Sequence, residues 1–236
     1  MDITPQTPIS TIVTEVPAAI AVLQKYGVAF CCTGATPLSA ACAHHDIDAA
    51  RVIADIETAR APRASQAAPD QTMRDVIAHI QQRYHQPLRD ELPRLSLMLA
   101  KVVLRHGERM PDVLVPLQST FEQFHDELLE HMAKEDQGIF PAIADLESGA
   151  SGASGSPAAA QWLKDPLEML VADHAGAETA LARMRELTDS YTPPADACPT
   201  FRGLYYGLAE LERDMQIHIH MENEILFPRA LACARA

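Results

Sequence analysis

The sequence predicts an all-α protein in which a small helical unit precedes an up-down four-helix bundle. Hydrophobic residues make up 47% of the chain but aromatic residues only 5%, and Ala, Leu and Met, which favour helix, are plentiful. Beyond residue 70, four long segments with helical periodicity are separated by three short connections, a pattern typical of a bundle. A His-x-x-x-Glu motif also occurs twice, followed each time by Phe-Pro at the same spacing.

Residues 1–60 are predicted to form the small unit. A short amphipathic helix is expected at residues 17–26, where Gly27 stops it, and a second at residues 37–43. A third helix is expected to begin at residue 48. Such a unit is too small to be stable alone, so its helices must pack against each other or against a neighbour.

The bundle is predicted to occupy residues 71–236, after a linker at residues 61–70 that carries two prolines and no apolar periodicity. Because Pro87 and Pro93 lie inside the first predicted helix, a kink or a break is expected near them. A flexible Gly- and Ser-rich loop is expected to join the second and third helices. The four predicted helices span residues 72–106, 112–147, 157–190 and 199–232.

The repeated motif predicts a metal centre inside the bundle. Four residues is little more than one helical turn, so the His and the Glu of each copy share a helix face. Each preceding helix offers one further His at a similar separation, so each hairpin supplies two imidazoles and one carboxylate. The predicted ligands are His85, His131, Glu135, His174, His218 and Glu222.

Four imidazoles and two carboxylates suit two iron or manganese ions better than a thiolate-rich zinc site. Two six-coordinate ions offer about twelve positions, and bridging by both carboxylates and one oxygen leaves about one open position per metal. The centre is therefore predicted to bind a small ligand. The alternative is a metal-free core of hydrogen-bonded polar groups, which would cost several kcal/mol for each poorly compensated group.

Other polar residues near the motifs are predicted to have lesser roles. Glu127 and Glu178 each lie four positions from a predicted ligand, so they are candidates for supporting an imidazole or relaying protons. Tyr84 and Asp173, each next to a ligand, are weaker candidates of the same kind. Three further histidines face away from the predicted centre and are not expected to bind metal: His79, His125 and His220.

Two adjacent cysteines form a second chemical feature. Cys31 and Cys32 precede the predicted helix at residues 37–43, and the N-terminus of a helix can make nearby thiols reactive. Adjacent cysteines rarely bridge each other, and Cys42 offers a resolving thiol. The alternative is that both are small buried hydrophobic residues.

The overall charge and the cysteine content limit the partners. A formal net charge of −13 argues against nucleic acid or an anionic membrane as the main partner. No apolar run approaches the ~20 residues that span a bilayer, and no secretory signal is visible at the start. Five cysteines, an odd number, do not suggest a secreted disulfide framework. A cytoplasmic protein is therefore expected.

Several longer motifs extend over nearly the whole chain. They are YGVAFCC at residues 26–32, LSAAC at 38–42, RYH at 83–85 with LP at 92–93, HMAKE at 131–135 with FP at 140–141, DH at 173–174, and HIHMEN at 218–223 with LFPRA at 226–230. With these motifs the chain resembles the RIC (repair of iron centres) di-iron proteins. Proteins of that family join an ScdA-type N-terminal domain to a hemerythrin-like bundle.

The resemblance implies an oxo- or hydroxo-bridged centre of two iron ions. It implies terminal His ligands, bridging roles for Glu135 and Glu222, a place for Glu127 on a route to the irons, and participation of Cys31 and Cys32. The implied function is recovery of iron–sulfur clusters damaged by nitric oxide or oxidants, with iron–sulfur proteins as clients and an electron donor. The oligomeric state is left open, a homodimer included. The terminal ligands would be His85, His131, His174 and His218.

The chain departs from the family pattern at three places. Leu88 replaces a second His, Thr33 interrupts the common Cys-Cys-Gly-Gly, and the segment around Glu178 is shifted, so the role of Glu178 is open. Two rival functions also remain. One is a hemerythrin-like carrier or sensor of oxygen or nitric oxide, and the other is a dedicated nitric-oxide reductase, so whether the protein is an enzyme is left open.

Overall fold

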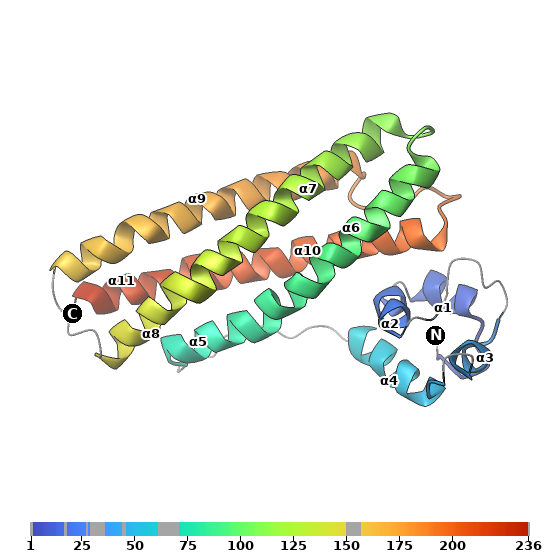
Figure 1. Cartoon of the computed structure of the whole chain (residues 1–236), viewed down its shortest axis with the longest axis horizontal. Helices are drawn as coiled ribbons and strands as arrows, with labels where there is room; N and C mark the ends of the chain where they lie inside the picture. Colours follow the sequence, from blue (N-terminus) through green and yellow to red (C-terminus); the bar gives the residue numbers. More distant parts are fainter. Residues whose placement is uncertain are drawn as a thin grey trace.

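The computed structural model describes residues 2–16, 18–26, 28, 36–43, 46–60, 71–149 and 157–235, and the regular structure in these ranges is helical (Figure 1). The predicted linker at residues 61–70 lies outside the described residues, as do Cys31 and Cys32. Among the described helices, none combines the length of a bilayer crossing with the apolar character that such a crossing requires.

The described part of the N-terminal unit contains four short helices, of which the sequence predicted three. The helices at 17–26, at 37–43 and from residue 48 are confirmed with small shifts, whereas the first helix was missed. Its residues, Ile-Ser-Thr-Ile-Val-Thr-Glu, include several β-branched side chains with low helix propensity. The four helices are α1 (Ile9–Glu15), α2 (Ala19–Lys25), α3 (Leu38–Ala43) and α4 (Ala49–Arg60).

Backbone hydrogen bonds hold both flanks of the segment that carries the adjacent cysteines. On one side, the amide of Val28 donates to the carbonyl of Leu23 at 2.9 Å. On the other, the carbonyl of Thr36 accepts from Ile9, and the amide of Leu38 donates to Thr7, each at 3.0 Å. The two ends of this segment are therefore anchored to the helical unit.

The bundle consists of four long antiparallel helical rods, as predicted, and three of them contain a short π-helical turn (Figure 1). The first rod is α5 (Met73–Ile80), η1 (Gln81–His85) and α6 (Gln86–His106). The second is α7 (Pro111–Lys134), η2 (Glu135–Ile139) and α8 (Phe140–Ser148). The third is α9 (Pro157–Leu187), and the fourth is α10 (Pro199–His220), η3 (Met221–Leu226) and α11 (Phe227–Arg235).

The ends of the rods follow from local chemistry. Thr72 and Asp75 form a capping box at the start of α5, and the Glu147 carboxylate accepts from the amides of Met73 and Arg74 at 2.7 and 3.0 Å. The two hydrogen bonds to Glu147 join the start of the first rod to the end of the second. The third rod ends at Leu187, three residues before the predicted end, because the chain enters left-handed backbone conformations. The residues with positive φ there are Asp189, Ser190 and Tyr191.

The predicted break near Pro87 and Pro93 is absent, and the irregularity found near Pro87 is a widened turn. The first rod continues through both prolines, and the irregularity is the π-helical turn η1, which ends just before Pro87. A proline has no N–H for the carbonyl four residues earlier, and its ring crowds that carbonyl. In η1, η2 and η3 the residue before the proline donates to the carbonyl five residues back, so the widened turn absorbs the defect. The repeated Phe-Pro of the sequence marks two of these turns.

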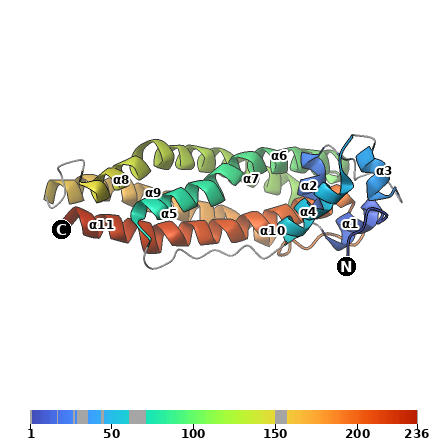
Figure 2. The same ribbon diagram turned by 90° about the horizontal axis from the view of Figure 1, so that it is seen from below.

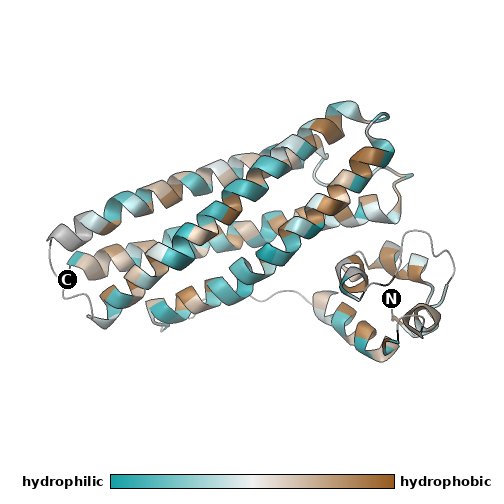
Figure 3. Ribbon diagram, viewed as in Figure 1, coloured by the Kyte–Doolittle hydropathy of each residue, from teal (hydrophilic) through white to brown (hydrophobic). Residues whose placement is uncertain are grey.

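Each rod is amphipathic, and hydrophobic segments alternate with hydrophilic ones along it (Figure 3). The first rod packs against the second through α6 and α7, and against the fourth through α6 and α10. The third rod packs against the second through α7 and α9, and against the fourth through α9 and α11. This order around the bundle decides which polar residues can meet in its core.

The N-terminal unit packs against the first part of α10 through α1 and α2 (Figure 2). Gly203 permits this approach, because a Cβ atom at that position would lie only 2.4 Å from Cδ1 of Ile20. A cavity of about 130 Å³ lies at this junction, with Ile20 and Ala59 on one side and Tyr84, Arg94 and Gly203 among its bundle residues. The unit therefore finds a neighbour for its apolar faces, as its small size requires.

Candidate metal centre

The six predicted ligands all lie in the bundle core, on four different rods. Two of them, Glu135 and Glu222, belong to the π-helical turns η2 and η3, and His85 is the last residue of η1. All six side chains are buried, and the most exposed of them, that of His131, retains only 4% of its accessible surface. Ionisable groups are rarely buried so completely unless they are paired or bind a metal.

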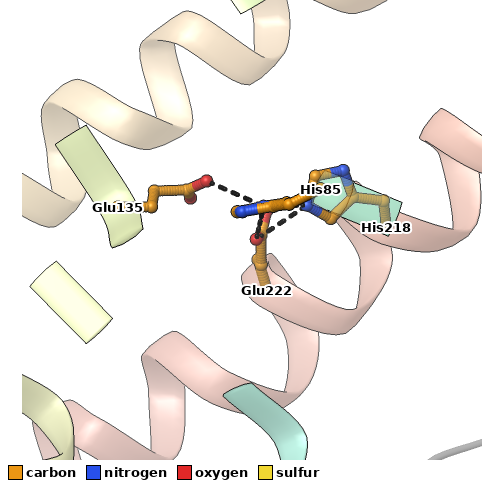
Figure 4. A group of neighbouring side chains, drawn as sticks. All are labelled: His85, Glu135, His218 and Glu222. Atoms are coloured by element: carbon orange, nitrogen blue, oxygen red, sulfur yellow. Dashed lines mark hydrogen bonds and ion pairs between the residues drawn. The ribbon is translucent and has the colours of Figure 1, made fainter. Parts of the chain in front are cut away.

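The structure brings the six residues together as two groups of four that share both carboxylates. One group is His85, Glu135, His218 and Glu222, which converge in Figure 4. The other group exchanges the two histidines for His131 and His174. Within each group one ligand atom per residue lies within 4.8 Å of the others, so each group can hold one metal ion. Each pair of histidines contains one residue from each helical hairpin.

Each carboxylate directs its two oxygens toward different histidine pairs. Glu222 Oε1 lies 2.9 Å from His218 Nε2, and its Oε2 lies 3.1 Å from His174 Nε2. Glu135 repeats this arrangement, with Oε1 3.3 Å from His131 Nε2 and Oε2 3.4 Å from His85 Nε2. This is the placement that two bridging carboxylates need between two metal ions.

The inner atoms of the group lack the partners that a metal-free core would provide. Both oxygens of Glu135 and Oε2 of Glu222 are buried without a hydrogen bond, because their approaches to the imidazoles have poor geometry. Within each histidine pair the two Nε2 atoms are 3.0 Å apart. Unpaired buried acceptors are costly, and a cation between them would satisfy all of them together. The residues therefore fit a metal centre.

Three of the four imidazoles are held from behind through Nδ1. His85 Nδ1 donates to Asp136 Oδ1 at 2.9 Å, and His174 Nδ1 to Asn223 Oδ1 at the same distance. His131 Nδ1 approaches Asp173 Oδ2 at 3.4 Å, whereas Nδ1 of His218 is buried without a partner. A proton on Nδ1 leaves the lone pair of Nε2 facing inward, as metal binding requires.

The sequence prediction missed Asp136 and Asn223 as supporting residues. It had favoured Glu127 and Glu178, which are exposed, and had placed Asp173 among the weaker candidates. A signal was present, however, because Asp136 and Asn223 each directly follow a predicted carboxylate ligand. In both hairpins that residue reaches the histidine of the preceding rod, so the repeat extends one residue further than the motif.

Electrostatics in the centre favour bound positive charge. Burial alone would lower the pKa of His85, but the hydrogen bond with Asp136 and the nearby Glu135 carboxylate outweigh it and raise this pKa to about 9. For His174, burial is likewise outweighed, chiefly by Glu222, and the pKa is raised. Burial would raise the pKa of Glu222, but the neighbouring His218 and His174 hold it well below its usual range. Without metal the cluster therefore holds protons where cations would bind.

A cavity of about 250 Å³ leads to the pair formed by His131 and His174, and its walls are partly apolar and partly polar. It is lined by both His131 and His174, by Phe124 and Met215, and by Glu127. Glu127 accepts a hydrogen bond from Gln123 and does not belong to either metal-binding group. Its position beside this cavity agrees with the predicted place on a route to the centre.

Aromatic rings cover much of the rest of the centre. The Tyr84 ring is stacked on His218, with centroids 5.3 Å apart, and Phe140 and Phe227 lie against His85 and His174 at 5.5 and 6.0 Å. The two phenylalanines belong to the repeated Phe-Pro pairs. The other histidines of the described residues join neither metal-binding group: His79, His106, His125 and His220.

Comparison with known families divides the chain into two matched regions. Residues 76–230, which contain all six candidate ligands, match the family described as "Hemerythrin HHE cation binding domain". Residues 5–60, which contain Cys31 and Cys32, match the family ScdA_N, described as "Domain of Unknown function (DUF542)".

Full-length relatives share both regions. The chain is 36% identical over 228 residues to the iron-sulfur cluster repair protein ScdA of Staphylococcus haemolyticus, covering 95% of this chain and 98% of that protein. It is 33% identical over 226 residues to the iron-sulfur cluster repair protein YtfE of Enterobacter sp. (strain 638), covering 95% and 96%. The YtfE protein of Salmonella paratyphi B is 34% identical over 233 residues.

Proposed function

This chain belongs to the family of iron-sulfur cluster repair proteins that carry a hemerythrin HHE cation binding domain, and we propose that it is a non-haem di-iron protein that repairs or protects damaged iron–sulfur clusters. The damage would arise from nitric oxide or oxidants. Its clients would be iron–sulfur proteins, and the cytoplasm is the compartment where it would meet them.

One observation carries the proposal. Glu135 and Glu222 each present one oxygen to one histidine pair and the other oxygen to the second pair. A site for a single metal ion would not need each carboxylate to face two different histidine pairs. We propose that one iron is bound by His85 and His218, the other by His131 and His174, and that both carboxylates bridge them. Imidazole and carboxylate ligands without thiolates suit iron in this role.

When bound, the irons would supply redox-active coordination positions for nitric oxide or oxygen and a store of iron for a damaged cluster. The chain itself contributes the surroundings. Buried aromatic rings exclude bulk water, the cavity beside His131 and His174 leaves room for a small ligand, and Asp136 orients His85. Glu127, which lines that cavity, would exchange protons with solvent.

Cys31 and Cys32 would serve the repair reaction as thiols that exchange electrons or a nitrosyl group with a partner. Both cysteines belong to the region that matches the ScdA_N family, which the chain shares with the iron-sulfur cluster repair proteins over nearly its full length. An electron donor would be needed to return the centre and the thiols to the reduced state.

The proposal is tested by reconstituting the purified protein with ferrous iron under anaerobic conditions. We expect about two irons per chain, Mössbauer signals of a coupled di-iron centre after oxidation, and restored activity of an iron–sulfur dehydratase previously damaged by nitric oxide. Binding of fewer than about one iron per chain would contradict the proposal.

Replacing both Cys31 and Cys32 with serine is expected to remove most of the repair activity while leaving the iron content unchanged. The reason is that the thiols lie outside the metal-binding region. Repair of a damaged cluster enzyme and bound iron are measured on the same preparation, with Cys233→Ser as the control. A carrier or sensor would instead bind its gas reversibly and be indifferent to the double substitution. A dedicated reductase would turn over many equivalents of nitric oxide without restoring the client.

A further inference from the structure

We propose that the two metal positions are inequivalent, and that the position bound by His131 and His174 is the one from which iron is released and reloaded. The position bound by His85 and His218 would retain its iron. This inference rests on the proposed di-iron function. It is carried by two residues at equivalent places in the two hairpins, Tyr84 and Asp173, which surround the two metal positions differently.

Tyr84 directly precedes His85 on the first rod, and Asp173 directly precedes His174 on the third rod, so they occupy equivalent places in the two hairpins. Tyr84 reaches His218 on the fourth rod, and Asp173 reaches His131 on the second rod. Tyr84 is 1% exposed and covers the face of His218, with the two rings nearly parallel at 3°. Asp173 touches His131 only at 3.4 Å, and its side chain is 40% exposed. A buried aromatic ring therefore closes one position, whereas a solvated carboxylate stands at the other.

The room around the two positions agrees with this difference. The cavity of about 250 Å³ is lined by both His131 and His174, together with Asp173. His85 and His218, by contrast, have no exposed surface. A departing iron needs incoming water or another ligand to replace its imidazoles, and the cavity admits such ligands to one position.

Charge along the cavity favours the passage of a cation. Three carboxylates line it, those of Glu127, Glu130 and Asp173, against one ammonium group, that of Lys134. Lys134 is within 3.1 Å of Glu130 and 3.5 Å of Asp173, so the cavity keeps an excess of negative charge. Clefts lined by one sign of charge concentrate ions of the opposite sign.

The support behind the imidazoles also differs. His85 is held by the Asp136 carboxylate, which is itself fixed by Gln81 at 2.8 Å and by Arg89. His174 is held by the neutral amide oxygen of Asn223. A carboxylate behind an imidazole makes it a stronger ligand than an amide does. Of these two histidines, His85 thus has the more basic and more rigid support. In the other two, Nδ1 of His218 has no partner and its ring is held by the stacked Tyr84, whereas Nδ1 of His131 only approaches the solvated Asp173 carboxylate.

The test measures iron release from the reduced, reconstituted protein mixed rapidly with a ferrous chelator. We expect two phases of equal amplitude. In crystals frozen after the first phase, iron-edge anomalous maps should show loss at the His131 and His174 position and full occupancy at the other. This readout needs no substitution and no catalytic activity.

Substitutions exchange the features of the two positions. Asn223→Asp, which places a carboxylate behind His174, should slow the first phase about tenfold. Asp173→Tyr should slow the same phase by covering His131, and Asp136→Asn should accelerate the second phase about tenfold. Asp126→Asn, which changes an exposed carboxylate on the second rod outside the cavity, is the control and should change neither phase.

Three results would overturn the inference while leaving the proposed function intact. They are release of two irons in one phase, earlier loss at the His85 and His218 position, and an unchanged first phase in both Asn223→Asp and Asp173→Tyr. If the protein never binds two irons, the proposed function itself fails, and that outcome is visible before any chelator is added.

Discussion

Replacing Glu222 with leucine is expected to abolish the proposed di-iron centre and, with it, cluster repair. This carboxylate is fully buried and contacts histidines of both pairs, so its loss removes one ligand from each metal position at once. Loss of a hydrogen-bond partner behind a ligand already costs about 10–100-fold in metal affinity, and loss of a bridging ligand should cost more. We expect less than about one iron per chain and at least a 100-fold drop in repair rate.

Glu224→Leu is the matched control for this substitution. Glu224 belongs to the same π-helical turn, two residues further on, but its side chain is exposed. The control should keep its iron, its absorption spectrum and its repair activity. A Glu222→Leu protein that still bound about two irons with an unchanged Mössbauer spectrum would refute the bridging role.

Removing the iron is expected to lower the melting temperature of the protein by about 10 °C. Binding at a free metal concentration about 1,000 times the Kd stabilises the folded state by about 4 kcal/mol, and 1 kcal/mol is worth about 2–4 °C in a protein of this size. The physical cause is that both oxygens of Glu135 and Oε2 of Glu222 are buried without a hydrogen bond, and a bound cation would coordinate them. Calorimetry of metal-free and reconstituted protein measures the difference.

The Glu222→Leu variant provides the control for the thermal experiment. Its melting temperature should not change when iron is added, because the centre cannot form. Leucine removes one partner of the buried pairs with His174 and His218, so the variant should be less stable than the metal-free parent protein, and the comparison is the change that iron causes within each protein. Equal stabilisation of both proteins by iron would place the bound metal elsewhere.

The metal-free protein should also lose stability as the pH rises from 6.5 to about 9. The pKa of His85 is raised to about 9, so the folded state holds a proton that the unfolded chain has already lost in this window. At the acidic end, stability falls below about 4.5, because the depressed pKa of Glu222 lets the unfolded chain bind the proton first. The iron-loaded protein should not show the loss toward pH 9, since metal replaces the proton.

Much of the fold was predictable because helix periodicity and turn residues are local properties. The four long rods, Thr72 as the first cap and the helices at residues 37–43 and from residue 48 follow from such signals. The helix α1 was not predictable in this way. Its sequence has low helix propensity, and burial of Ile9, Ile12 and Val13 in the core stabilises it as a helix.

The π-helical turns show a second limit of sequence reasoning. A proline inside a helical pattern predicts a defect, but the defect can be a kink, a break or a widened turn. Each rod here packs against two neighbours and continues as a helix past its proline. The widened turns absorb the missing hydrogen bond, and His85, Glu135 and Glu222 lie in them.

The sequence by itself determined which six side chains could form the centre, since a His and a Glu four residues apart share a helix face whatever surrounds them. Only the tertiary structure decided which histidines would share a metal. Each rod contacts two neighbours, and the core packing brings His85 to His218 and His131 to His174. The same packing places Tyr84 over one pair and Asp173 beside the other. Contacts between rods depend on the order of helices around the bundle, and no spacing within one helix contains that information.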